Sequence, residues 1–376
     1  MSKSIGNQYG RIVVKCGTSL VTSHGAGVNE RFVSGLSDQV SSVISTGSEV
    51  VLVVSGAVGM GRSLLREEVP ESTVSKQVLA AVGQAPLMAH LSREFNRHDI
   101  IVAQTLIDRA SVENRTGYLN ARNTLLELTQ RGILPVVNEN DVVATEELNL
   151  GDNDRLSGLV ANLVDADLLV LLTDVDGYFR RIKDGDMQLV PQIDRVTDEM
   201  LSESGGTVSG LGTGGMRAKL EAARLAMSHG VTVVVASGTE PDILHRIVSM
   251  EMVGSWFVPT AERKESRDRW MLANLGIKGR ITVDIGAEKA VRKNGKSLLP
   301  AGVIEVQGNF DRGGLVVLCD VSANHFGRGL VNYGSTDIGR IKGCDSGEII
   351  SVLGYSHGQE IIHRNNMVIS DLPVTP

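Results

Sequence analysis

The sequence predicts an α/β protein: a mainly parallel, open β-sheet with helices on both faces, followed by a small all-β, barrel-like module. Short apolar runs alternate with segments of helical periodicity from about residue 11 to residue 257, which is the pattern of βαβ units. Several runs end in glycine or in acidic and amide residues, as at the carboxyl ends of parallel strands. After residue 279 the apolar runs become short and are broken by glycine, which is typical of small β modules.

The first predicted strand, 11–15, runs into Cys16-Gly17-Thr18-Ser19. A lysine followed by glycine and small hydroxyl residues at a strand end suits a phosphate, because it offers a cation and accessible backbone N–H groups. A second turn of this kind, Ser55-Gly56-Ala57, follows the next strand. The remaining elements expected in this half are a helix from Asn29, a strand at 50–54, a helix at 79–95, a strand at 100–106, and a helix ending at Gln130 with Arg115, Arg122 and Asn123 exposed.

The stretch from Gly132 to Gly177 concentrates the chemistry. An apolar run at 133–137 leads to Asn138-Glu139-Asn140-Asp141, and Gly151-Asp152-Asn153-Asp154 precedes a run of helical periodicity. The strand at 168–172 then ends in Thr173-Asp174. A lone Asp before a helix is more often only an N-cap. Two clusters of acids and amides at neighbouring strand ends are harder to explain as caps, because their crowded carboxylates repel one another unless a metal or an ammonium group lies between them. This stretch therefore predicts a site for a cationic small molecule beside a nucleotide.

The segment from Gly205 to Lys219 is rich in glycine and precedes an alanine-rich helix at 216–229 and a strand at 231–236. Glycine at this density costs backbone entropy on folding. A flexible lid would explain this density of glycine, and so would a phosphate-binding loop with Lys219 in the first turns of the helix that follows. We favour the phosphate-binding loop.

The second part of the chain begins after a charged run, 260–269, expected to be a solvated linker or helix. Strands are expected at 281–285, 303–306, 315–318 and 349–353. The segment 290–297 resembles a Walker A loop but does not lie between a buried strand and a helix, so we reject it. The expected domains are 8–258 (catalytic), 259–278 (linker), 279–356 (barrel-like module) and 357–376 (a frayed tail).

Composition excludes several classes of protein. Lys and Arg total 37 against 44 Asp and Glu, a net charge of -7, which argues against bulk nucleic-acid or membrane binding. The three cysteines and eight histidines show no metal-ligand spacing. No apolar run approaches the ~20 residues of a membrane helix, and no signal segment begins the sequence. A cytoplasmic protein is expected.

In their order along the chain, these motifs resemble the amino acid kinase family, and within it the members that phosphorylate glutamate. The resemblance covers nearly the whole chain. The markers are Val14 to Ser19, Val54 to Ala57, Val137 to Asp141, Gly151 to Asp154, Leu172 to Asp174, and Gly212 to Met216 with Lys219. The C-terminal module, with 298–303 and 308–310, resembles a PUA domain.

The resemblance implies ATP-dependent phosphorylation of the side-chain carboxylate of L-glutamate to L-glutamyl 5-phosphate, the first step of proline biosynthesis. It also implies Mg²⁺ as cofactor, with no protein ligand named for it. Proline is expected as a feedback inhibitor, and the chain as a homo-oligomer, dimer or tetramer. Glutamyl phosphate reductase is a further expected partner, whereas a membrane and nucleic acid are not.

The resemblance also implies roles for individual residues. The catalytic residues are Lys15, Lys219, Asp154, Gly17 and Gly56, with Asp154 orienting the lysines and the glycines offering backbone N–H groups. The substrate-binding residues are Ser55, Asp141 and Asn153, with Asp141 facing the substrate ammonium. The nucleotide-binding residues are Lys15, Thr173, Asp174, Thr213, Gly214, Gly215, Met216, Arg217, Ala218 and Lys219.

Elementary chemistry agrees with these roles. A side-chain carboxylate with a pKa near ~4.3 is already an anion at neutral pH and needs no general base. What the reaction needs is positive charge that compensates two anions brought together.

Other readings stay open. The chain could be another member of the family, acting on acetylglutamate, aspartate or uridylate. A rival of another class is an RNA-binding protein that acts through the PUA-like module, although residues 279–353 mix basic with acidic side chains, which is a poor electrostatic footprint for RNA.

Overall fold

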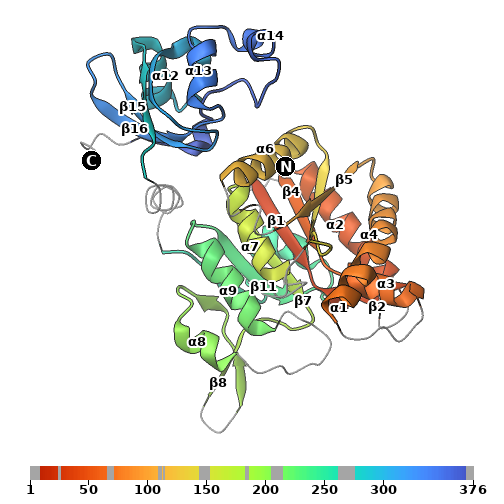
Figure 1. The fold of residues 1–376 in the computed structure, drawn as a ribbon. Helices are drawn as coiled ribbons and strands as arrows, with labels where there is room; N and C mark the ends of the chain where they lie inside the picture. The colour runs from red at the N-terminus through yellow and green to blue at the C-terminus, as the bar shows by residue number, and fades with distance from the viewer. Residues whose placement is uncertain are drawn as a thin grey trace, which may run out of the picture. The chain divides into compact units, whose positions relative to one another are not determined.

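The computed structural model describes residues 9–23, 27–65, 72–108, 112, 115–143, 153–182, 186–204, 215–260 and 276–369. The chain divides into two compact units, residues 1–112 with 121–266 and residues 113–120 with 267–376 (Figure 1). None of the helices in these ranges has the length and apolar character needed to cross a membrane.

The first unit is built on one eight-stranded sheet in the order β10-β12-β11-β7-β1-β4-β6-β5. Neighbouring strands pair in parallel except β11 with β12. The strands are β1 (Arg11–Cys16), β4 (Glu49–Val54), β5 (Val102–Ile107), β6 (Leu134–Glu139), β7 (Leu168–Thr173), β10 (Gln192–Ile193), β11 (Thr232–Ser237) and β12 (Ser255–Phe257). The prediction of a mainly parallel sheet is confirmed, and the short strands β10 and β12 extend it on one side.

Helices cover both faces of this sheet. On one face, α2 (Glu30–Ser45), α4 (Thr73–Asn96) and α10 (Ile243–Val248) pack on alternate strand residues such as Ile12 and Val14. On the other face, α7 (Asn153–Leu163) and α9 (Met216–Met227) lie side by side along β7 and β11 (Figure 1). The helix boundaries follow local chemistry. Asn29 caps α2 by accepting from the Phe32 N–H, and Ser72 caps α4 by accepting from the Ser75 N–H.

The remaining elements of the first unit are α1 (Thr18–Val21), α3 (Ala57–Leu65), α8 (Asp198–Glu203) and two hairpins, β2 (Thr22–Ser23) with β3 (Gly27–Val28) and β8 (Phe179–Arg181) with β9 (Met187–Leu189). Helix α6 (Arg115–Gln130) belongs to this unit from residue 121 on, and its earlier residues belong to the second unit.

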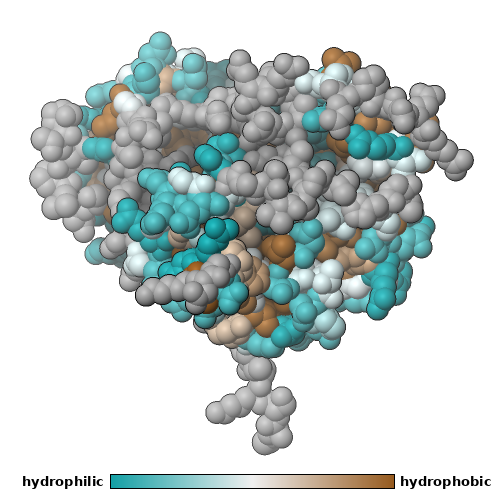
Figure 2. Space-filling view, turned by 90° about the horizontal axis from the view of Figure 1, so that it is seen from below, coloured by the Kyte–Doolittle hydropathy of each residue, from teal (hydrophilic) through white to brown (hydrophobic). Residues whose placement is uncertain are grey.

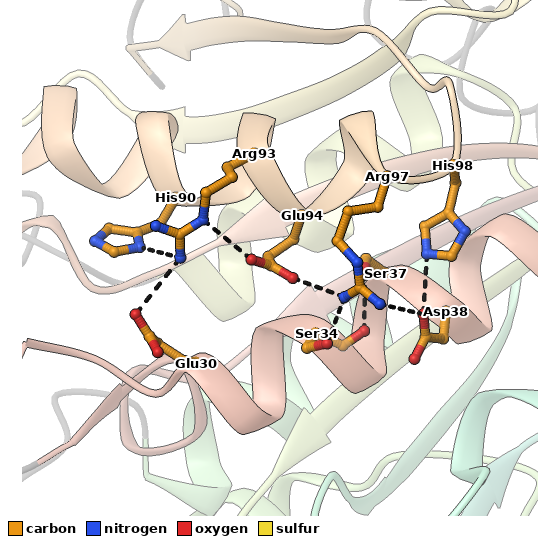
Figure 3. Close-up of polar contacts among 9 residues, drawn as sticks. All are labelled: Glu30, Ser34, Ser37, Asp38, His90, Arg93, Glu94, Arg97 and His98. Atoms are coloured by element: carbon orange, nitrogen blue, oxygen red, sulfur yellow. Dashed lines mark hydrogen bonds and ion pairs between the residues drawn. The ribbon is translucent and has the colours of Figure 1, made fainter.

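On the solvent side, α2 and α4 are joined by a ladder of polar contacts (Figure 3). Between the two helices, Arg93 pairs with Glu30 at 3.5 Å, Arg97 donates to Ser34 Oγ at 2.7 Å and His98 pairs with Asp38 at 2.9 Å. Within α4, Arg97 also pairs with Glu94 at 2.8 Å. Arg93, Glu30, Arg97 and Asp38 are each at least half exposed, so each ion pair contributes little, about 0–1 kcal/mol, and salt screens it. The ladder fixes the pairing of two helices that already share the apolar core.

Arg122 is buried, not exposed as the sequence suggested: 1% of it is accessible. Its guanidinium donates to the Leu163 carbonyl at the end of α7 and pairs with Asp165. Arg11 donates to the next carbonyl, that of Val164. The last carbonyls of a helix have no partner within the helix, so these two arginines supply donors that the sequence pattern cannot reveal.

The second unit holds a five-stranded sheet in the order β14-β13-β15-β16-β17. The strands are β13 (Gly279–Val283), β14 (Val303–Gly308), β15 (Leu315–Cys319), β16 (His325–Leu330) and β17 (Met367–Ile369). Helices accompany the sheet: α12 (Ile285–Asn294), α13 (Ser335–Ile341), α14 (Ile349–Leu353) and the 3₁₀ turns η3 (Pro300–Gly302), η4 (Ser346–Glu348) and η5 (Arg364–Asn366).

Two expectations for this unit were wrong. Residues 349–353 form helix α14 rather than a strand, because a capping box between Asp345 and Glu348 starts the turn before it and Gly354 ends it in a left-handed conformation. The segment after residue 356 is not all frayed tail. Ile361 and Ile362 are fully buried, and β17 pairs with β16.

The structure agrees with the rejection of segment 290–297 as a Walker A loop. Helix α12 ends at Asn294, and Gly295 caps it with φ 57°. Lys296 therefore follows the carboxyl end of a helix, where carbonyl oxygens are presented, whereas a phosphate loop precedes the amino end.

Helices α7 and α9 approach closely at Gly158. A Cβ added there would lie 3.0 Å from the Ala222 carbonyl oxygen and 3.3 Å from Ala222 Cα. Asn162, one turn later, donates from Nδ2 to the Leu225 carbonyl at 3.2 Å. Because the neighbouring atoms at Gly158 belong to the backbone of α9, a side chain there can be accommodated only if the helix moves.

We expect Gly158→Ala to lower the free energy of unfolding by about 1–2 kcal/mol, because overpacking against the α9 backbone outweighs the better helix propensity of alanine. Gly35→Ala in α2 is the matched control. A Cβ at Gly35 meets nothing within 4 Å, so this variant should be stabilised by about 0.5–1 kcal/mol. Urea denaturation of both variants measures the difference, and equal shifts of the same sign would contradict it.

Candidate active site

A buried cluster of charges lies at the carboxyl edge of the sheet. Lys15, at the end of β1, places Nζ 2.5 Å from Asp154 Oδ1, and Lys219, on α9, places Nζ 3.2 Å from Asp154 Oδ2. Asp154 lies in the first turn of α7, and its side chain is fully buried. The three expected catalytic side chains are thus brought together from one strand and two helices.

Burial and charge act against each other at Asp154. Burial alone would raise the pKa of its carboxyl, but the ammonium groups of Lys15 and Lys219 outweigh it and hold the pKa below the ordinary value. One carboxylate between two ammonium groups leaves a net positive charge in a poorly solvated place. Such a cluster can stabilise a phosphoryl group, because the charges are already in position.

Beside this cluster lies a relay of amides at the ends of β4 and β6. Asn153 Nδ2 donates to Ser55 Oγ at 3.0 Å and to Asn138 Oδ1 at 2.9 Å. Asn138 Nδ2 donates in turn to Gln84 Oε1 of α4 at 2.8 Å. The remaining oxygen, Asn153 Oδ1, is buried and has no hydrogen-bond partner among the described residues. The relay thus leaves one buried acceptor in need of a donor.

Asp141 follows β6 and is 8% exposed. Burial, and then the nearby Glu139 carboxylate, raise the pKa of Asp141 to about 7. A carboxylate in this position gains from any cation placed beside it. Asp141 and Asn153 Oδ1 both suit the same kind of partner, an ammonium group.

The two glycines expected to offer backbone N–H groups differ. The Gly17 N–H already donates to the Leu172 carbonyl at 3.1 Å, so the expectation that it is available to a phosphate is wrong for this conformation. Gly56 directly precedes α3 and has φ 125°, and a Cβ there would lie 3.0 Å from Thr22 Cγ2. Glycine is therefore required at residue 56, where L side chains are strained.

The expected nucleotide-binding residues lie at neighbouring strand ends. Thr173, at the end of β7, is buried, and its Oγ1 donates to Asp174 Oδ1 at 3.1 Å. The Gly238 N–H, just after β11, donates to the Thr173 carbonyl at 2.8 Å. The adjacent β7 and β11 thus present their polar ends together.

The residues around the start of α9 are placed only in part. Gly215 caps the helix without a side-chain bond, and Met216 to Lys219 form its first turn. The Arg217 guanidinium is turned to Glu221 at 3.1 Å. Thr213 and Gly214, like Asp152 and the rest of the glycine-rich run, lie outside the described residues.

Sequence reasoning missed Gln84 altogether and named Asn138 only as part of a motif. Asn138 carried a signal, since it directly follows an apolar run at a strand end. Gln84 carried none, because a polar residue in a helix is ordinarily solvated and only the tertiary fold brings it to β6.

This edge of the first unit also exposes apolar groups. Figure 2 views the molecule from below Figure 1, toward the carboxyl ends of the strands, and shows hydrophobic residues among hydrophilic ones. Val142, Val143 and Val175, each following a strand of this edge, are 55%, 57% and 40% exposed. Within the ranges described above, no group of three or more His, Cys, Asp and Glu side chains could hold a metal ion.

The comparisons with known proteins agree with this geometry. Residues 10–237 match the model of the amino acid kinase family. The chain belongs to the amino acid kinase family. The matched range contains every residue expected to be catalytic, substrate-binding or nucleotide-binding. Residues 279–353 match the PUA domain.

Curated relatives in the amino acid kinase family match nearly the whole chain. A glutamate 5-kinase of Dehalococcoides mccartyi is 44% identical over 97% of this chain and 99% of its own length. A glutamate 5-kinase of Moorella thermoacetica is 45% identical over 96% and 97%. Among solved structures, a UMP kinase from Bacillus anthracis aligns with 67% of this chain and 97% of its own, at 17% identity and a TM-score of 0.47. The curated relatives therefore share both parts of the chain.

We expect Asp141→Asn to stabilise the folded protein at neutral and alkaline pH. The pKa of Asp141 is raised to about 7 in the fold, so the native state binds this proton more tightly than the unfolded chain. Stability contributed by the protonated carboxyl is lost as pH rises from about 4 to 7. The asparagine variant avoids that loss and should gain on the order of 2–4 kcal/mol over wild type above pH 7.

Denaturation of both proteins from pH 4 to pH 8 measures this difference, which should grow through that window and then level off. A difference independent of pH, or an NMR titration that places the Asp141 pKa near its ordinary value, would contradict the assignment.

Proposed function

We propose that the chain is a glutamate 5-kinase, which transfers the γ-phosphoryl group of ATP to the side-chain carboxylate of L-glutamate and forms L-glutamyl 5-phosphate, the first step of proline biosynthesis. The observation that carries the proposal is the buried Lys15–Asp154–Lys219 cluster beside an acceptor, Asn153 Oδ1, that needs a donor. Relatives that bear this name across both units support it.

Electrostatic repulsion between two anions is the main obstacle to phosphoryl transfer to a carboxylate. The acceptor is already an anion, so no side chain has to remove a proton from it. The reaction brings this anion to a triphosphate and places more charge on the moving phosphoryl group. Lys15 and Lys219 supply the compensating charge from two sides. Asp154 holds both ammonium groups in place, so little reorganisation is needed at the moment of reaction.

The amide relay and Asp141 would bind the other end of glutamate. The substrate ammonium would donate to Asn153 Oδ1 and face the Asp141 carboxylate, while Ser55 lies in the same hydrogen-bond network. Both acceptors are buried, so a substrate without an ammonium group would leave them unsatisfied, which costs about 1–3 kcal/mol for each. This favours glutamate over acetylglutamate within the family.

The nucleotide would lie at the ends of β7 and β11 and the start of α9. Thr173, Asp174 and residues 213–219 are the proposed contacts, with Arg217 the weakest because it pairs with Glu221. Mg²⁺ belongs to the proposal on the general chemistry of kinases, in which it neutralises charge on the β- and γ-phosphates. Its protein ligands are left unnamed.

The proposal includes partners. A homo-oligomer is supported by an exposed apolar stripe on α4, in which Val74, Val78 and Val82 are 67%, 48% and 36% accessible at a spacing of one helical turn. Feedback inhibition by proline, association with glutamyl phosphate reductase and a cytoplasmic location remain predictions. A regulatory role for the PUA domain is favoured over RNA binding. Salt-dependent binding of structured RNA by the full chain would instead support an RNA-binding role.

We expect the purified chain to form an acyl phosphate from L-glutamate and ATP, because glutamate satisfies both buried acceptors. Hydroxylamine traps the product as a hydroxamate, and parallel reactions with aspartate and acetylglutamate serve as controls. Glutamate should be preferred over either by at least tenfold, as expected for a site whose buried polar groups would otherwise stay unpaired. A preference for acetylglutamate or aspartate would overturn the proposal in favour of another member of the family.

We expect Lys219→Ala to lower kcat by about 10²–10³, because its charge matters most where negative charge accumulates on the moving phosphoryl group. Lys219→Arg should rescue little, since a planar guanidinium does not fit the place of a compact ammonium beside Asp154. Arg224→Ala, later in the same helix and paired with Asp198 at 2.7 Å, is the matched control and should leave kcat within a few-fold. A folded Lys219→Ala variant with near-normal kcat would show that the cluster is structural.

A further inference from the structure

We infer that Gln84 is a positioning residue that holds Asn138 in its orientation within the amide relay, so that Asn153 presents an acceptor rather than a donor to the substrate ammonium. The inference rests on the proposed function, because it concerns the same site. Gln84 lies on α4, outside the strand ends that supply the other site residues, and it touches no residue of the charged cluster among the contacts described above.

The direction of the relay is set by one backbone group. The Glu139 N–H donates to Asn138 Oδ1 at 2.9 Å. A backbone N–H can only donate, so the Asn138 atom facing it must be the oxygen. The other end of the Asn138 amide is then the NH₂ group, which needs an acceptor. Gln84 Oε1, at 2.8 Å, is that acceptor.

The same argument fixes the orientation of the Asn153 amide. Asn138 Oδ1 also faces the Asn153 amide at 2.9 Å, so the Asn153 atom there must be Nδ2. The Val54 carbonyl, 3.4 Å from this Nδ2, can only accept and therefore requires the same orientation. The oxygen of Asn153 is left as a buried acceptor without a partner among the described residues. Each amide in the series has one allowed orientation.

Gln84 is the member of the relay that can be changed without touching the proposed ligand contacts. Without its oxygen, the Asn138 NH₂ group loses its acceptor in a buried place, and the amide gains by rotating toward another partner. Rotation of Asn138 removes the acceptor that orients Asn153. The variant is therefore expected to bind the ammonium end of the substrate less well and to bind the nucleotide as the wild type does.

Steady-state kinetics of Gln84→Met tests this with L-glutamate and with glutarate, which lacks the ammonium group. We expect the KM for glutamate to rise about fivefold to tenfold, as for one lost hydrogen bond, with the KM for ATP unchanged. The preference for glutamate over glutarate, as a ratio of kcat/KM, should fall by a similar factor. Gln84→Glu keeps an acceptor and should retain most of this preference.

Gln39→Met is the matched control. Gln39 is also half-buried in a helix, and its Oε1 accepts from the Leu244 N–H at 2.9 Å, away from the relay. This variant loses a comparable bond and should keep the wild-type preference. If Gln84→Met does not fold, Gln84→Ala, with the better helix propensity, provides the same comparison.

An unchanged glutamate-to-glutarate preference in a folded Gln84→Met or Gln84→Ala variant overturns the inference and leaves the proposed function standing. Loss of preference in Gln39→Met to the same degree also overturns it, since the effect would then be general loosening. A wild-type protein that does not phosphorylate glutamate overturns the proposed function and the inference together.

Discussion

The structure of the first unit depends on one buried carboxylate. Asp154 has no exposed side-chain surface and lies between two lysines that come from a strand and a helix far apart in the sequence. A buried charge without partners is strongly destabilising, so the end of β1, the start of α7 and the first turns of α9 must meet. Removing Asp154 would take from two buried ammonium groups the carboxylate that lies between them. The same contact that holds three elements together creates the positive site that phosphoryl transfer requires.

Helix α7 joins the two halves of the site. Successive residues of a helix point about 100° apart, so Asn153 faces the amide relay while Asp154 faces the lysines. The helix is held at its other end by Arg11 and Arg122, which donate to its last carbonyls, and along its length by the close approach at Gly158. A helix fixed in this way cannot shift along its axis without moving both the substrate contacts and the charged cluster.

Much of this arrangement could be predicted from the sequence, and the failures have physical causes. The strands β1, β4 and β7 each contain an unbroken apolar run, and Lys15, Asn153 and Asp154 stand where such runs end or a helix begins. Arg122 seemed exposed because its burial depends on carbonyls of another helix. Residues 349–353 seemed a strand because a five-residue apolar run has no period to decide it. Gln84 could not be found, since its role exists only after β6 and α4 are packed together.

Two features of the site lower the stability of the folded chain when no ligand is bound. Burial and Glu139 raise the pKa of Asp141 to about 7, and Asn153 keeps a buried oxygen without a donor among the described residues. Each is unfavourable in the isolated chain, and an apolar or amide substitution would relieve either. Both costs disappear when one ammonium group enters, because it donates to the oxygen and neutralises the carboxylate. The presence of both near the end of β6 is therefore better explained by selection for a cationic ligand than by folding.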